Sequence, residues 1–328
     1  MYTEQSFTII TDPMPIGRHL LLEVFKKIMR SIKYFFFSRP LGSHPYYRGH
    51  VAVTRSLLEG LAKRNSSAFN YNPNLFNSFH PTLLVLSGVT TLKQAISLKR
   101  KGKIKKIIAG PNIVIFSSDF NNLIASSEID LVITPSEIIN QLYILDNLSL
   151  KGRIAAWPAG VDTEFWKPNP EISRKQILIY EKQIKGPVGP VEPYADYLRS
   201  LGYQVHVIQY GNYTLEEYKK QLLQSFLMIG FVTDESQGIA WAEAWSCDVP
   251  TFLWNNHSNI YRGRIYSCTT APYLTEENGI FFDNFSDFIF KLQQWENNAF
   301  SFEPRKWCLE IMSDEVCANN LLKLIETC

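Results

Sequence analysis

The feature that most constrains this chain is a repeated alternation of short, strand-like apolar runs with longer segments of helical periodicity. The strand-like runs are rich in β-branched and aromatic residues. Most of them precede a segment with apolar residues every three or four positions. Clear examples are IKYFFF (32–37), LLVLSG (83–88), IKKIIAG (104–110), DLVIT (130–134), QILIY (176–180), QVHVIQYG (204–211) and FLMIGFVT (226–233). This alternation predicts an α/β fold built on parallel sheets with crossover helices.

The alternation is interrupted once, which indicates two domains. The segment FWKPNPEISRK (165–175) contains two prolines and mixed charge, and strand-like runs resume after it. A length of 328 residues also suits about two domains. We therefore predict an N-terminal extension over 1–31, a Rossmann-like domain over 32–165, a linker over 166–175 and a second Rossmann-like domain over 176–328. Ligands of such sheets bind beyond the carboxyl ends of the strands, so both domains are expected to face a shared cleft.

Charge and hydropathy narrow the class of protein. The chain has 33 Lys and Arg against 31 Asp and Glu, and a net charge of +2 gives no reason to expect a nucleic-acid partner. Five scattered cysteines, no long apolar run and no secretory signal predict a cytoplasmic location. Residues 18–31 have the apolar and basic faces of an amphipathic helix. Two interpretations stay open for it: a helix packed on the first domain, or peripheral contact with a membrane surface.

The strongest local motif is TDESQGIAWAEAWSCDVP (233–250). It follows a strand-like run, and its polar loop leads into a helix that carries Glu243, eight positions after Glu235. The backbone N–H groups of Gln237, Gly238 and Ile239 should be free at the start of this helix, which favours an anion there. Gly238 would let a ligand approach the backbone closely.

This segment resembles the E-x7-E region of retaining GT-B glycosyltransferases, commonly E-G-F-G-x4-E-A-M-A-x-G-x-P. The shared positions are Glu235, Gly238, Glu243, Ala244 and Pro250, and the departures are Ser236, Gln237, Trp245 and Asp248. The resemblance implies a catalytic position beside the donor sugar for Glu235. It implies that Glu243 binds the ribose hydroxyls of the donor.

Two further segments carry the same resemblance. WPAGVDTEFWKP (157–168) is similar to the P-x-G-V-D-x-x-x-F-x-P segment that closes the first domain in this superfamily. In ILIYEKQIKG (177–186), Lys182 and Lys185 take the places of the family's Arg and Lys, although Glu181 stands where a glycine is usual. Both lysines are expected to neutralise the donor diphosphate.

The first domain supplies the expected acceptor side. The loop 38–49 resembles the glycine-containing loop that opens this domain in the family, and Gly49 would let the backbone approach the donor. His44, Tyr47 and Arg48 lie in the same loop and are candidates for acceptor binding. Asn112 stands where many relatives have a sugar-contacting histidine, so it offers a hydrogen bond without a charge.

The resemblance implies a hexosyltransferase that uses a nucleotide sugar, acts with retention, and glycosylates a hydroxyl of a glycan or lipid-linked glycan. No D-x-D triplet occurs, which favours a metal-independent site that needs no cofactor. Two alternatives stay open. One is a non-catalytic GT-B protein that binds a sugar or nucleotide beside an active partner enzyme. The other is a GT-B enzyme of different outcome, either a nucleotide-sugar epimerase or a phosphorylase.

Overall fold

The computed structural model describes residues 6–11, 50–64, 69–71, 79–182 and 191–328. The chain forms two compact units. Unit 1 comprises Arg48–Pro158 and Ala318–Cys328 together with the N-terminal strand, and unit 2 is Ala159–Cys317. Within the described ranges, no helix is both long and apolar enough to cross a bilayer. The predicted amphipathic helix, residues 18–31, lies outside those ranges, so both interpretations of it stay predictions.

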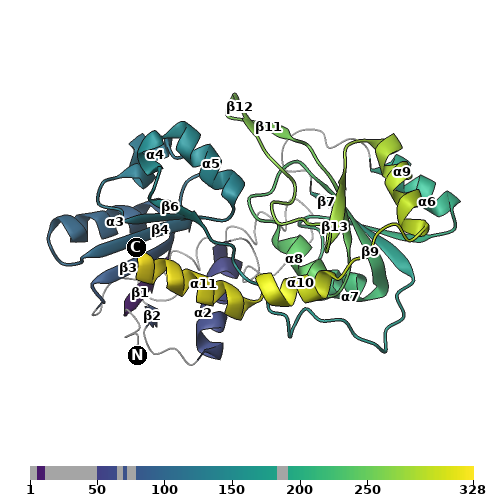
Figure 1. Ribbon diagram of the computed structural model, residues 1–328, viewed down its shortest axis with the longest axis horizontal. Helices are drawn as coiled ribbons and strands as arrows, with labels where there is room; N and C mark the ends of the chain where they lie inside the picture. Colours follow the sequence, from purple (N-terminus) through teal and green to yellow (C-terminus); the bar gives the residue numbers. More distant parts are fainter. Residues whose placement is uncertain (1–5, 12–49, 65–68, 72–78, 183–190) are drawn as a thin grey trace, which may run out of the picture. The chain divides into compact units, whose positions relative to one another are not determined.

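Unit 1 is built on a parallel sheet of six described strands. These are β1 (Phe7–Ile10), β2 (Phe69–Tyr71), β3 (Thr82–Ser87), β4 (Lys106–Asn112), β5 (Leu131–Thr134) and β6 (Ile154–Ala156). They lie in the order β2-β1-β3-β4-β5-β6. The described helical segments of this unit are α2 (His50–Lys63), α3 (Val89–Arg100), α4 (Asp119–Asn122), η2 (Leu123–Ala125), α5 (Glu137–Asp146) and η3 (Leu148–Leu150) (Figure 1).

Strand β1 corrects the predicted N-terminal extension over 1–31. Phe7, Ile9 and Ile10 are fully buried, and β1 pairs with both β2 and β3. All four residues of FTII are buried, Thr8 included, so this strand lacks the alternation of buried and exposed residues that marks a half-exposed strand. The prediction that residues 1–31 form an extension outside the first domain is therefore wrong for residues 7–10. The segment 32–37, which we expected to be a strand of the first domain, lies outside the described residues.

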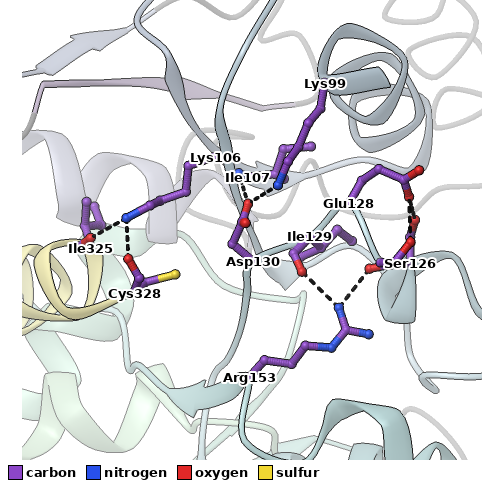
Figure 2. Close-up of polar contacts among 11 residues, drawn as sticks. Lys99, Lys106, Ile107, Ser126, Glu128, Ile129, Asp130, Arg153, Ile325 and Cys328 are labelled. Atoms are coloured by element: carbon purple, nitrogen blue, oxygen red, sulfur yellow. Dashed lines mark hydrogen bonds and ion pairs between the residues drawn. The ribbon is translucent and has the colours of Figure 1, made fainter. Parts of the chain in front are cut away.

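Polar contacts of Lys99 and Arg153 hold the loops of unit 1 near the starts of β4, β5 and β6 (Figure 2). The Asp130 carboxylate accepts from Lys99 Nζ at 2.5 Å and from the Ile107 N–H at 2.7 Å. The Arg153 guanidinium donates to the carbonyls of Ser126 and Ile129, at 2.8 and 2.9 Å. These basic side chains are thus satisfied by structural partners in this unit.

Unit 2 is built on a second parallel sheet. Its strands are β7 (Gln176–Lys182), β8 (Gln204–Gln209), β9 (Ser225–Val232), β10 (Thr251–Trp254) and β13 (Gly279–Phe282), in the order β13-β10-β9-β7-β8. The helices described in unit 2 are α6 (Glu192–Ser200), α7 (Leu215–Gln224), α8 (Ile239–Ser246), α9 (Phe285–Glu296) and α10 (Pro304–Ile311). An antiparallel hairpin, β11 (Ser258–Tyr261) and β12 (Arg264–Ser267), extends away from the sheet of this unit (Figure 1).

The sheet of unit 2 has an apolar core on each face, because side chains alternate along every strand. Leu178 and Tyr180 of β7 face the cluster that contains Trp241 of α8. Ile177 and Ile179 face the opposite cluster, which includes residues of α6 and α9. The alternation in QILIY therefore buries both faces of the strand.

The two units differ from the predicted domain bounds at two places. The predicted linker 166–175 begins inside unit 2, because Trp166 is buried there and its ring lies 5.6 Å from that of Tyr218. At the other end of the chain, helix α11 (Asp314–Thr327) starts in unit 2, but Ala318–Cys328 belongs to unit 1. There Lys106 Nζ donates to the Cys328 carbonyl at 2.5 Å (Figure 2).

Candidate functional site

The carboxyl ends of β7 and β9 bring Lys182 and Glu235 together. Lys182 is the last residue of β7 and is paired in register with Val232, the last residue of β9. Glu235 follows in the next loop, and its Oε1 lies 2.5 Å from Lys182 Nζ. The side chains of Lys182 and Glu235 are only 18% and 15% exposed. Two residues far apart in sequence therefore form one largely buried ion pair at the edge where α/β sheets bind ligands.

The lysine of this pair is held in its charged form. Burial by itself lowers the pKa of Lys182, but the Glu235 carboxylate opposes it, with smaller contributions from Tyr210 and Asp234. The net effect raises the pKa of Lys182 above its usual value. Lys182 Nζ also lies 5.0 Å from the centre of the Tyr210 ring, a cation–π distance. The site therefore offers a permanent positive charge at neutral pH.

The loop after β9 leads directly into α8, as the sequence predicts. Gly238 caps this helix with a left-handed backbone, φ 85° and ψ 57°. A Cβ at Gly238 would lie 2.2 Å from Cδ1 of the buried Trp241 ring, so no larger residue fits without displacing the indole. The helix N-terminus thus lies a few residues from the Lys182–Glu235 pair, with Ile239 as its first residue. Its free N–H groups add a partial positive charge to the same region.

Gln237 has a structural role that its sequence position did not suggest. Its side chain is 5% exposed and forms two hydrogen bonds with the backbone of Ala159. The Ala159 N–H donates to Gln237 Oε1 at 3.0 Å, and Gln237 Nε2 donates to the Ala159 carbonyl at 2.6 Å. The backbone N–H of Gln237, rather than its side chain, is the predicted donor contact, and that role stays a prediction. The Gln237 side chain links the loop after β9 to Ala159, the first residue of this segment of unit 2.

Glu243 lies on α8, is partly buried, and interacts electrostatically with Tyr213 and Tyr218. Burial is the main cause that raises the pKa of Tyr213, and the charges of Glu243 and Glu235 raise it further. Tyr213 also hydrogen-bonds to Tyr180 at 3.1 Å between the hydroxyl oxygens. Tyr213 is therefore electrostatically coupled to both glutamates of the E-x7-E motif, which makes it a further candidate for ligand contact. In the sequence, the signal for Tyr213 is its position two residues after the strand-like run 204–211.

Asn112 ends β4 at the carboxyl edge of the sheet in unit 1. Its Nδ2 is buried and has no hydrogen-bond partner among the described residues. Ser87 lies beside it in register, and its hydroxyl is 2.5 Å from that of Thr11, the residue after β1. Such an orphan donor beside small hydroxyl groups suits a polar ligand. Thr11 and Ser87 are not among the predicted site residues. Thr11 follows β1, which the sequence pattern does not identify as a strand, and Ser87 ends β3, a predicted strand, but only the folded sheet places it beside Asn112 and Thr11.

Several predicted site residues lie outside the described residues. They are Gly49, His44, Tyr47 and Arg48 of the first loop, and Lys185 after β7. Their roles stay predictions. Within the part of the chain that is described, no group of three or more His, Cys, Asp or Glu side chains is arranged to hold a metal ion.

The segment 157–168 is structural, as expected. A Cβ on Gly160 would lie 2.5 Å from the Asp314 Cα, so only glycine allows this close approach of two backbones. The Asp314 N–H donates a hydrogen bond to the Val161 carbonyl at 3.1 Å. Asp162 Oδ1 accepts from the N–H groups of Glu164 and Phe165, at 3.1 and 3.2 Å. The motif therefore shapes the turn that begins unit 2.

Comparison with known proteins identifies the fold. No protein-family model matches the chain, and no curated protein sequence matches it. Solved structures do match, beginning with HepE from Anabaena in complex with UDP: the TM-score is 0.56 at 12% identity, covering 99% of this chain and 100% of HepE. A glycosyltransferase from Rickettsia africae has a TM-score of 0.54 at 11% identity over 97% of each chain. Sucrose-phosphate synthase from Thermosynechococcus elongatus has 0.52 at 10% over 98% of each.

At these identities the likeness shows the fold alone. Together with the two parallel sheets, it establishes that the chain has the GT-B fold of two Rossmann-like domains. The predicted fold class is confirmed.

Proposed function

We propose that this protein is a glycosyltransferase that moves a hexosyl group from a nucleotide sugar to a hydroxyl of a glycan or lipid-linked glycan. The observation that carries the proposal is the largely buried Lys182–Glu235 pair beside the N-terminus of α8. The structural neighbour HepE supports a nucleotide-sugar donor, since it was solved with UDP and also with UDP and glucose.

The geometry suggests how a donor would use this pair. A diphosphate above α8 would meet the helix N-terminus and the Lys182 ammonium, and both favour the negative charge of a departing nucleotide. The diphosphate oxygens would compete with Glu235 for Lys182, which would release the Glu235 carboxylate toward the sugar. Glu243 would bind the ribose hydroxyls, deeper along α8. This scheme supplies its positive charge from the protein, and it accords with a metal-independent reaction that proceeds with retention.

Unit 1 would bind the acceptor through its own sheet edge. The orphan Nδ2 of Asn112 can donate to a sugar hydroxyl oxygen, and the adjoining hydroxyls of Ser87 and Thr11 are of the kind that hydrogen-bond polyols. The loop residues His44, Tyr47 and Arg48 stay part of the proposal as further acceptor contacts. A cytoplasmic protein with peripheral membrane contact through residues 18–31 would suit a lipid-linked acceptor.

A non-catalytic GT-B protein is the second candidate. The observation that favours it is Gln237, which stands in the donor loop where the resembling enzymes usually have phenylalanine. Its side chain forms two hydrogen bonds with the backbone of Ala159. Such a protein would bind a nucleotide or sugar without turnover. An epimerase would release free nucleotide without an acceptor, and a phosphorylase would require inorganic phosphate.

Thermal shift with UDP, GDP, ADP, CDP and dTDP sugars, each with and without EDTA, tests the proposal first. A ligand that binds only the folded state raises its stability by mass action. We expect one nucleotide to stabilise the protein equally in both conditions. The stabilising donor is then incubated with acceptor glycans, and wild type is compared with Glu235→Gln.

Transfer that disappears in a folded, donor-binding Glu235→Gln variant would support the catalytic position of Glu235. Full transfer by that variant would contradict it. Donor binding with no turnover by wild type would favour the non-catalytic candidate. No stabilisation by any donor would overturn the proposed function.

A further inference from the structure

The hairpin β11–β12 is connected to the Lys182–Glu235 site by a short relay of hydrogen bonds. Tyr266 of β12 donates its hydroxyl proton to the carboxylate of Asp234, the residue before Glu235. Asn259 of β11, the cross-strand partner of Tyr266, donates its amide Nδ2–H to the Tyr266 hydroxyl oxygen at 3.1 Å. Asp234 can only accept when ionised, so the Asn259 contact orients the phenol proton toward it.

The base of the hairpin joins the same loop through the backbone. The Glu235 N–H donates to the carbonyl of Thr269, just after β12, at 3.0 Å. The Cys268 N–H donates to the carbonyl of His257 at 2.9 Å and closes the hairpin. The position of β12 therefore determines where both Asp234 and Glu235 lie.

The two faces of the hairpin differ in character. Ile260 and Ile265 pair across the strands and are 60% and 72% exposed. Because side chains alternate along a strand, Asn259 and Tyr266 lie on the opposite face. That polar face is the one that reaches the loop after β9.

Asp234 is a second carboxylate that could compete with Glu235 for Lys182. Its charge is among those that raise the pKa of Lys182, so the two groups interact. Yet the ion pair that forms is with Glu235, while Asp234 is bound to Tyr266. A carboxylate released from Tyr266 would gain by turning toward the ammonium, since charge-assisted hydrogen bonds are the stronger ones.

We propose that Tyr266 is a positioning residue: it holds Asp234 on the hairpin side of the loop, and so reserves Lys182 for Glu235 and for the donor diphosphate. The hairpin thus contributes to the donor site through Tyr266. The effect on donor binding rests on the function proposed above, whereas the effect on the loop does not.

The test compares Tyr266→Phe, which removes the hydroxyl that donates to Asp234, with Tyr261→Phe, which removes a hydroxyl from the same polar face of the hairpin. Hydrogen exchange of the segment 233–238 is followed without ligand. We expect roughly tenfold faster exchange in Tyr266→Phe, as for the loss of one hydrogen bond to a charged group, and wild-type exchange in Tyr261→Phe. Equal exchange in the two variants and wild type would overturn the proposal.

A double-mutant cycle with Asp234→Asn separates positioning from general loosening. Affinity for UDP-glucose is measured by calorimetry, and Tyr266→Phe is expected to weaken it roughly tenfold. In the Asp234→Asn background no competing carboxylate remains, so the same substitution should cause no further loss. An equal loss in both backgrounds would show that Tyr266 acts only through stability, and would contradict the proposal.

Failure of wild type to bind UDP-glucose would count against the proposed function with this donor. The exchange comparison would still decide the role of Tyr266.

Discussion

Replacing Gly238 with alanine is expected to lower the free energy of unfolding of unit 2 by about 2–5 kcal/mol. The left-handed backbone at φ +85° costs a residue with a Cβ roughly 1–2 kcal/mol. The new methyl would also lie 2.2 Å from Trp241 Cδ1, so the ring must move. Its Nε1–H donates to the Thr270 carbonyl at 2.8 Å in a fully buried position. Loss of that bond adds about 1–3 kcal/mol.

Urea denaturation with linear extrapolation measures this loss. Gly263→Ala is the matched control, because Gly263 is also left-handed, at φ +76°, but has nothing within 4 Å of its would-be Cβ. Both substitutions lie in unit 2, so the same unfolding transition is compared. Gly263→Ala should lose only the backbone contribution of about 1–2 kcal/mol. A loss in Gly238→Ala no larger than that of the control would show that the indole moves without cost, and would refute the reasoning.

Three further predictions concern charge and reactivity. Lys182→Met should weaken binding of the stabilising nucleotide sugar roughly 10- to 100-fold by calorimetry, while Lys167→Met, in the exposed ion pair with Glu164, should leave it unchanged. The Arg100 hydrogen bond, followed by that of Ser126, lowers the pKa of Glu128 to about 2, so this carboxylate stabilises the fold above its unfolded pKa of about 4.3. The stability advantage of wild type over Glu128→Gln should therefore shrink as the pH falls from about 4 to about 2, and an advantage independent of pH would contradict this account. Cys328 is exposed whereas the other four cysteines are buried, so native protein should show one fast-reacting thiol with Ellman's reagent, and Cys328→Ser should abolish that phase.

Much of the architecture is determined by local sequence pattern. The alternation of strand-like and helical runs predicts two parallel sheets, and both are found. The start of α8 near Gly238 could be predicted because a polar, glycine-containing loop between a strand and a helix is a local signal. The same local reasoning located Lys182 at the end of one strand and Glu235 in the loop after another. It did not recognise FTII, since a short run of three apolar residues and one threonine fits several structures equally well.

What only the tertiary structure decided is which of these positions meet. Strand order is non-local, so the sequence could not show that β7 lies beside β9 and pairs Lys182 with Val232. The approach of Tyr266 to Asp234 likewise depends on where the hairpin leaves β10 and which face it turns toward the loop. The periodicity of apolar residues predicts which side chains are buried, but it does not predict which residues they contact. The sequence by itself therefore determined the fold class and the positions of the site residues, whereas the folded sheet decided their partners and charges.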